Sequence, residues 1–370
     1  MTHRLWQRLE QKARLRRQRG LNRNVESRSD LTDLASNDYL GLSTHPDVIA
    51  AAREALTHYG LGAGSSRAVR GTTDIHRRLE HELAALTGQD EALLYSSGYM
   101  ANLGALTALG SVAPRGRTFL FDAHVHASLH DAARMTNLQV ESFRHNDLQD
   151  LETQLETHRP FLVAVESVYS VLGDRAPLQE IQRLCSAYDA LLVVDEAHAL
   201  GVVGTRGGGL SGSVDGDNIV VTGTLSKALA SAGGFVSGPR SLRAHLTDTS
   251  RPFIYDTAPP PATIAGALAA LERSTEAVGA RNVIRRRIAT AARRFHVAES
   301  EGAILSIPAG DADTASRWAR HVSERGVAVG CFRPPSTPDH VSRLRLTINT
   351  SVSEAEFDAA LTTIEKERDV

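Results

Sequence analysis

Lys227 is the residue whose type and position most clearly indicate a chemical role. The chain has 370 residues with 41 Lys plus Arg, and only Lys12, Lys227 and Lys366 are lysines. Arginine stays charged, whereas a lysine amine can lose its proton and form a Schiff base with a carbonyl group. Lys227 lies in the small-residue segment TGTLSKALASAGG, directly after the apolar run NIVV. Two interpretations remain open here: a Schiff-base lysine, or a chance survivor of a compositional bias toward arginine.

A carboxylate and an imidazole end another apolar run, LLVVDEAH. Asp195 is the last residue of the predicted strand, and His198 follows three residues later. A buried carboxylate is costly unless a cation, a metal ion or a protonated heterocycle pairs with it. The alternative is that Asp195 only caps the helix that follows.

Three histidines lie close together in HVHASLH, at His124, His126 and His130. The His-x-His spacing of the first two occurs at metal sites of two-metal hydrolases. Such a motif has an Asp where Ser128 stands, and no second cluster occurs among the 15 histidines. We therefore favour His126 as an aromatic plate that faces a ligand, and we expect no metal.

Two further strand ends carry polar groups. SSGYMANLGAL begins as a Ser/Gly turn and continues as a helix, so its free N–H groups can form an anion site suited to a phosphate. The alternative is an ordinary turn from a strand to a helix, which can also carry Ser-Gly. FLVAVESVYS ends with Glu166 and Ser170, which can hydrogen-bond a bound ring or simply cap a helix.

These polar groups follow short apolar runs that alternate with helix-like segments between about residues 45 and 240. The runs are EALLY, TFLFD, FLVAVE, ALLVVDE, NIVVT and GGFVSG. Such alternation predicts an α/β fold with a mostly parallel sheet. Because ligands bind outside the carboxyl ends of parallel strands, we expect the polar groups to meet in one pocket.

After about residue 250 the pattern changes to that of a smaller α+β unit, with the runs VAVGCF and LRLTIN and a final amphipathic helix from Ser353 to Lys366. We expect three parts: an N-terminal helix and arm over 1–45, a large α/β domain over 46–245 and a small C-terminal α+β domain over 246–370.

Composition excludes several classes of function. A formal net charge of −2 gives no overall attraction to nucleic acid or to an anionic membrane, so neither is expected as a partner. We find no export signal and no apolar stretch of about 18 residues. Cys185 and Cys331 lack metal-ligand spacing, and we expect both to be buried free thiols of a cytoplasmic protein.

In chain order, these segments resemble the α-oxoamine synthases, a family of fold-type I pyridoxal-phosphate (PLP) enzymes. The resemblance covers nearly the whole chain and rests on SNDYLGLSTHP, SSGYMAN, HASL, LLVVDEAH, TGTLSKAL and RLRLT. It implies pyridoxal 5'-phosphate as cofactor, bound by the large domain. It also implies a mostly parallel central sheet of the seven-stranded type with helices on both faces.

The resemblance implies roles for the cofactor-binding residues. Lys227 is expected to bind PLP as a Schiff base and to remove the substrate Cα proton. Asp195 is expected to pair with the ring nitrogen, and His126 to stack on the ring. The remaining expected contacts are His198 and Ser170 to the 3′-oxygen, Gly98, Tyr99 and Thr224 to the phosphate, and Thr257 to the phosphate in the other subunit of a homodimer with a shared active site. Lys227, His126, Asp195 and His198 are the expected catalytic residues.

The resemblance also implies substrate contacts. Arg345 is expected to grip the amino-acid carboxylate, and Ser336, Asn37, His126 and Arg23 to lie near the substrates. Within the family, PFIYDT and CFRPPSTP are most similar to members that condense L-alanine with a pimeloyl thioester. The alternatives are a synthase of the glycine C-acetyltransferase or aminolevulinate synthase type, or a non-catalytic partner subunit. Such subunits lack the Schiff-base lysine.

Overall fold

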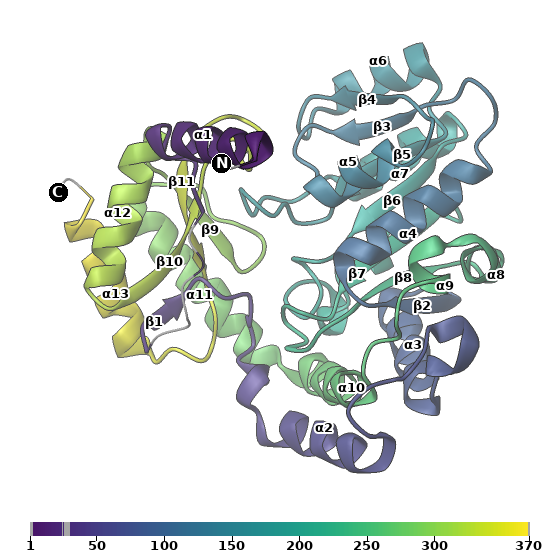
Figure 1. Ribbon diagram of the computed structural model, residues 1–370, viewed down its shortest axis with the longest axis horizontal. Helices are drawn as coiled ribbons and strands as arrows, with labels where there is room; N and C mark the ends of the chain where they lie inside the picture. The colour runs from purple at the N-terminus through teal and green to yellow at the C-terminus, as the bar shows by residue number, and fades with distance from the viewer. Residues whose placement is uncertain (1–2, 24, 26–29, 369–370) are drawn as a thin grey trace.

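Two β-sheets organise the computed structural model, which describes residues 3–23, 25 and 30–368 (Figure 1). The larger sheet has the strand order β2-β8-β7-β6-β5-β3-β4. Its strands are β2 (Glu91–Tyr95), β3 (Phe119–Asp122), β4 (Val140–Phe143), β5 (Leu162–Glu166), β6 (Leu191–Asp195), β7 (Ile219–Thr224) and β8 (Gly234–Gly238). Only β8 runs antiparallel to its neighbours, which confirms the predicted mostly parallel sheet.

Helices cover both faces of this sheet. They are α3 (Asp74–Thr87), α4 (Gly98–Ser111), α5 (Ala127–Arg134), α6 (Leu148–His158), α7 (Leu178–Ala187), α8 (Arg240–Thr249) and α9 (Arg251–Ile254). Along β6, Leu192 and Val194 pack into one hydrophobic core, and Val193 packs into the other. A strand buried on both faces needs apolar residues at every position, which is why its sequence shows no polar alternation.

The smaller sheet has the order β1-β10-β11-β9 and combines both ends of the chain. Its strands are β1 (Thr32–Leu34), β9 (Ile304–Pro308), β10 (Val327–Phe332) and β11 (Arg343–Thr347). The helices around it are α1 (Arg4–Gln18), α11 (Val278–Phe295), α12 (Ala312–Glu324) and α13 (Glu354–Lys366). Strand β1 pairs in parallel with β10, so Thr32–Leu34 of the predicted N-terminal arm form part of this sheet.

The two sheets lie side by side in separate lobes, with α2 (Pro46–Tyr59) and α10 (Pro261–Glu276) packed against each other between them and below them in Figure 1. Cys185 is buried as predicted, and both cysteines are free thiols. The prediction that Cys331 is buried is wrong: it is only partly buried, because it lines a groove that β10 forms with α12 and the end of α1. None of the helices in the described part of the chain has the length and apolar character needed to cross a membrane.

We expect Leu192→Ala to lower the free energy of unfolding by about 2–5 kcal/mol, because Leu192 is fully buried and its truncation leaves a cavity beneath the strand that ends at Asp195. Urea unfolding measures this change. As a control, Leu56→Ala on the exposed side of α2 should change the same quantity by no more than about 0.5 kcal/mol. Equal effects of the two substitutions would contradict the packing described here.

Candidate active site

Two adjoining cavities, of about 750 and 260 Å³, open at the carboxyl ends of the large sheet, and His126, His198 and Lys227 contact both of them. The smaller cavity also contacts Ser97, Gly98, Tyr99, Asn102, Ser128, Glu166, Asp195, Ala197, Thr224 and Ser226. The larger also contacts Arg23, Asn37, His124, His130, Ser170, Val171, Phe332, Ser336, Thr337, His340 and Arg345. The structure therefore confirms the prediction that the polar groups at the carboxyl ends of the strands meet at one place.

The amine of Lys227 lies near two buried carboxylates. Asp195 ends β6 and Glu166 ends β5, and the two are register partners on adjacent parallel strands. Burial lowers the pKa of Lys227 to about 8, although the carboxylates of Asp195 and Glu166 act in the opposite direction. Burial, and then the charge of Asp195, raises the pKa of Glu166 to about 8. Both groups can therefore exchange protons near neutral pH.

Asp195 is held by uncharged donors. Its Oδ2 accepts a 2.8 Å hydrogen bond from Asn102 Nδ2, and its Oδ1 accepts one of 2.9 Å from the backbone N–H of Ala197. The Asp195 side chain is only 5% exposed. A buried carboxylate with neutral partners and one side toward a cavity can receive a positively charged heterocycle.

A helix N-terminus forms another wall of the smaller cavity. α4 begins at Gly98, and the side chain of Ser97 caps it by accepting from the N–H of Met100 at 3.1 Å. A Cβ at Gly98 would lie 2.9 Å from the Cβ of Thr224, and a Cβ at Gly234 only 2.4 Å from the N of Gly98. Both glycines are therefore needed for the helix start to approach the ends of β7 and β8. The uncapped N–H groups can bind an anion there.

His126 and His198, which line both cavities, are each held by a different hydroxyl group. His126 Nδ1 lies 2.8 Å from Ser128 Oγ, which also accepts from Asn102 Nδ2. His198 Nδ1 lies 2.7 Å from the hydroxyl of Tyr39. Burial lowers the pKa of both histidines, and the nearby Lys227 amine lowers both further, so both rings are neutral at pH 7.

Arg345 reaches the larger cavity from β11 of the small sheet. Its Nη1 donates to the carbonyl of Ser170 at 2.8 Å, and its Nη2 donates to Asn37 Oδ1 at 3.2 Å. Its side chain packs on the Phe332 ring, at 4.3 Å from the centroid. Nη1 and Nη2 each carry a second N–H beyond the one used in these bonds, so the guanidinium keeps donors for a carboxylate ligand.

The remaining predicted site residues divide into two groups. Arg23 donates to Ser336 Oγ at 3.2 Å at the edge of the larger cavity. The side chain of Tyr99 instead turns to the surface, where its hydroxyl donates to Asp131 at 2.8 Å, so only its backbone, at the start of α4, can serve the predicted phosphate site. Thr257 contacts neither cavity; it is exposed and forms a backbone bridge with Ser66.

Two residues that belong to the site, Asn102 and Tyr39, were not identified from the sequence. Asn102 joins Asp195 to Ser128, and Tyr39 joins His198 to Asn37, with its hydroxyl 3.2 Å from Asn37 Oδ1. Both lie within motifs that were recognised. A polar residue among the apolar positions of α4 was the one signal that could have singled out Asn102.

The His-x-His pair does not point to a common ligand. His124 stacks on His145, with ring centroids 3.8 Å apart, whereas His126 bonds to Ser128. In the described part of the chain, no three His, Cys, Asp or Glu side chains are arranged to hold a metal ion.

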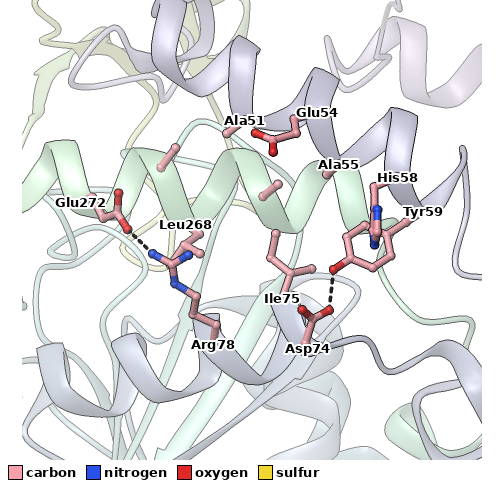
Figure 2. A pocket seen from close by; sticks show the side chains of 12 residues that line it. Ala51, Glu54, Ala55, His58, Tyr59, Asp74, Ile75, Arg78, Leu268 and Glu272 are labelled. Atoms are coloured by element: carbon pink, nitrogen blue, oxygen red, sulfur yellow. Dashed lines mark hydrogen bonds and ion pairs between the residues drawn. The ribbon is translucent and has the colours of Figure 1, made fainter.

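A further cavity, of about 550 Å³, lies between α2, α3 and α10, away from the predicted site residues (Figure 2). Two pairs of its polar groups bond to each other: Arg78 bonds to Glu272 at 3.0 Å, and the hydroxyl of Tyr59 donates to Asp74. None of the predicted site residues lines this cavity.

Comparison with known proteins defines the class. Residues 29–364 match the model of the family described as aminotransferase class I and II, so the chain belongs to this family.

Similar proteins and solved structures indicate which members of this family the chain resembles. The chain is 45% identical over 354 residues to an 8-amino-7-oxononanoate synthase of Mycolicibacterium smegmatis, covering 93% of this chain and 92% of that protein. Among solved structures, it resembles an 8-amino-7-oxononanoate synthase of Francisella tularensis with a TM-score of 0.78 and 26% identity, covering 91% of this chain and 97% of the other. It also resembles a serine palmitoyltransferase of S. paucimobilis with bound PLP, with a TM-score of 0.84 and 29% identity, covering 97% and 96% of the two chains.

We expect the amine of Lys227, in protein from which PLP has been removed, to react with an acylating reagent at a rate that rises with pH through a midpoint near 8, because only the uncharged amine is nucleophilic. Mass spectrometry of peptides measures this rate, with the exposed Lys12 and Lys366 as internal comparisons. In Asp195→Asn the midpoint should fall, because a carboxylate that stabilises the charged amine is removed. A midpoint for Lys227 equal to that of Lys12 would contradict this environment.

Proposed function

We propose that this chain condenses L-alanine with a pimeloyl thioester to give 8-amino-7-oxononanoate, CO2 and a free thiol, as a step of biotin biosynthesis. The observation that carries the proposal is the single small cavity that joins the amine of Lys227, the carboxylate of Asp195 and the N-terminus of α4. These three groups suit the aldehyde, the protonated ring nitrogen and the phosphate of PLP. The 45% identical synthase supports the same assignment.

Each residue has a defined task. PLP, when bound, supplies an electron-withdrawing ring that stabilises negative charge at the amino-acid Cα. Asp195 keeps the ring nitrogen protonated, and His126 forms the wall against the ring face. Thr224, beside the start of α4, contributes to the phosphate site, and His198 and Ser170 approach the ring oxygen. Lys227 holds the cofactor and then removes the Cα proton.

The substrates occupy the larger cavity. Arg345 binds the L-alanine carboxylate, and Asn37 fixes the guanidinium. The Cα–C bond to the acyl carbonyl forms as the C–S bond breaks, and the thiol leaves. The Cα–carboxylate bond then breaks to release CO2, and a proton returns to Cα. Arg23 and Ser336 lie toward the acyl end, where the described cavity lining contains no Asp or Glu, so a carboxylate-bearing acyl chain meets no acidic group there.

We also propose a homodimer with a shared active site, in which Thr257 completes the phosphate site of the other subunit. Thr257 is exposed and lies outside the cavities of its own chain. Large apolar side chains are exposed on the segments around it: Leu61 at 82%, Val69 at 74% and Tyr255 at 70%. Apolar exposure of this kind marks an interface. The free thiols fit a cytoplasmic location.

The test of the proposed function is product formation by the purified, PLP-loaded protein. L-alanine with pimeloyl-CoA should give 8-amino-7-oxononanoate, detected by mass spectrometry, whereas glycine or L-serine should give far less product. Lys227→Ala should lower kcat by at least about 1,000-fold, because the base is removed. Borohydride should fix a pyridoxyl group on Lys227 of the wild-type chain. Turnover of glycine with acetyl-CoA, but not of the proposed pair, would contradict the proposal.

We expect Arg345→Lys to raise KM for L-alanine about tenfold, since an ammonium cannot reproduce the paired donors of the guanidinium. Steady-state kinetics at saturating pimeloyl-CoA measures this change. Arg286→Lys, at an exposed position of α11, is the matched control and should leave KM unchanged. A wild-type KM in Arg345→Lys would show that the carboxylate binds elsewhere.

A further inference from the structure

His145 lies behind the wall of the larger cavity, outside both cavities, and joins three loops of the large sheet. The loop after β3 carries His124 and His126, and the loop after β5 carries Ser170. Both loops contact the larger cavity. His145 comes from the third loop, after β4.

Both ring nitrogens of His145 contact carboxylates. Nδ1 lies 2.8 Å from Asp122 Oδ1 at the end of β3, and Nε2 lies 2.8 Å from Asp174 Oδ2 beyond β5. Carboxylates only accept hydrogen bonds, so both nitrogens must carry protons and the ring is an imidazolium. Burial lowers the pKa of His145, but the hydrogen bonds that its ring donates to Asp122 and Asp174 outweigh burial and raise the pKa to about 9.

The same two carboxylates also bind the backbone of the loops. Asp122 is fully buried and accepts from the N–H of His124 at 2.8 Å and from the N–H of Asn146 at 2.9 Å. Asn146 Nδ2 in turn donates to Asp174 Oδ2 at 2.8 Å. A buried carboxylate with this many donors fixes the backbone around it, provided that its charge is neutralised.

The faces of the His145 ring are also occupied. His124 stacks on one face at 3.8 Å with an interplanar angle of 13°, and the ring of Tyr169 meets it edge-on at 4.4 Å. The titratable groups around His145 are thus Asp122 from β3, His124 from the next loop, and Tyr169 and Asp174 from the loop after β5. Because His124 also contacts the larger cavity, the His124 ring lies between the charged His145 ring and the space for the substrates.

We propose that His145 is a positioning residue for the larger cavity: by binding both Asp122 and Asp174, it fixes the wall that carries His124 and His126 relative to the loop that carries Ser170. The proposal rests on the proposed function for the identity of the substrates that occupy this cavity. The pH dependence follows from the sign of the shift. The raised pKa means that the two charged hydrogen bonds from His145 to Asp122 and Asp174, called here the His145 tie, are complete below about pH 6.5 and are lost as pH rises through about 9.

The test uses the PLP-loaded enzyme with L-alanine and pimeloyl-CoA. In His145→Gln, KM for pimeloyl-CoA should rise about fivefold or more, as expected for a buried carboxylate left without its charged donor. KM for L-alanine should rise as well, because the Ser170 carbonyl on the same loop accepts from Arg345. In the wild type, kcat/KM for pimeloyl-CoA should fall as pH approaches 9. His81→Gln, exposed on α3, is the matched control and should match the wild type.

A second variant covers the case in which His145→Gln does not fold. Asp174 is partly exposed, so Asp174→Asn preserves shape and removes one charge. It should lower the pKa of His145 and move the high-pH fall of kcat/KM to lower pH. An unmoved pH profile in Asp174→Asn, or a wild-type KM for pimeloyl-CoA in His145→Gln, overturns the proposal, even if either variant is less stable.

These outcomes differ from a failure of the proposed function. Wild-type protein that makes no product from L-alanine and pimeloyl-CoA would contradict that function. The tie would then be measured by the fall in the free energy of unfolding between pH 6.5 and 9, which should be smaller in Asp174→Asn than in the wild type. Equal falls would overturn the tie as well.

Discussion

The burial of one lysine amine beside two carboxylates is the constraint on which the site depends. Glu166 and Asp195 end adjacent parallel strands and are register partners, so the sheet itself brings their charges together. In a poorly solvated site, two such charges cannot both be stable without compensation. Lys227 and Glu166 both have a pKa of about 8, so at neutral pH the protonated amine of Lys227 supplies a positive charge and protonation of Glu166 removes one of the two negative charges.

The parallel sheet explains why this arrangement forms where it does. Strands β3, β5, β6 and β7 point the same way, so the residues that follow them meet at one edge. The large sheet alone does not complete the site. Arg345 belongs to β11 of the small sheet, and Asn37, which accepts from it, follows β1 of the same sheet. The cavity for substrates therefore depends on how the two lobes pack, whereas the cofactor cavity depends almost entirely on the large sheet.

Most of the strands in the large sheet, and the polar residues that directly follow them, could be predicted from the sequence. Six of the seven strands of the large sheet could be recognised, because strands buried on both faces are continuous apolar runs. β4 was missed because Val140–Phe143 includes Glu141 and Ser142 at the edge of the sheet, where one side faces solvent. The pairing of β1 with β10 was also beyond local patterns, since about 290 residues separate the strands. The division into three parts remains a prediction, and the roles assigned to individual residues remain proposals.

Supporting residues are harder to predict than reacting ones for a physical reason. Lys227 and Asp195 are recognisable because their types are costly at buried strand ends and therefore need an explanation. Asn102, Tyr39 and His145 contact other polar side chains that are distant in sequence: Asn102 bonds to Asp195, and Tyr39 to His198. No spacing rule predicts such pairs, so they become visible only in the folded structure. In the described cavity lining, the carboxylates contact the smaller cavity, and Arg23 and Arg345 contact the larger one. A cationic ring and anionic substrates can therefore occupy adjacent spaces, each opposite a complementary charge.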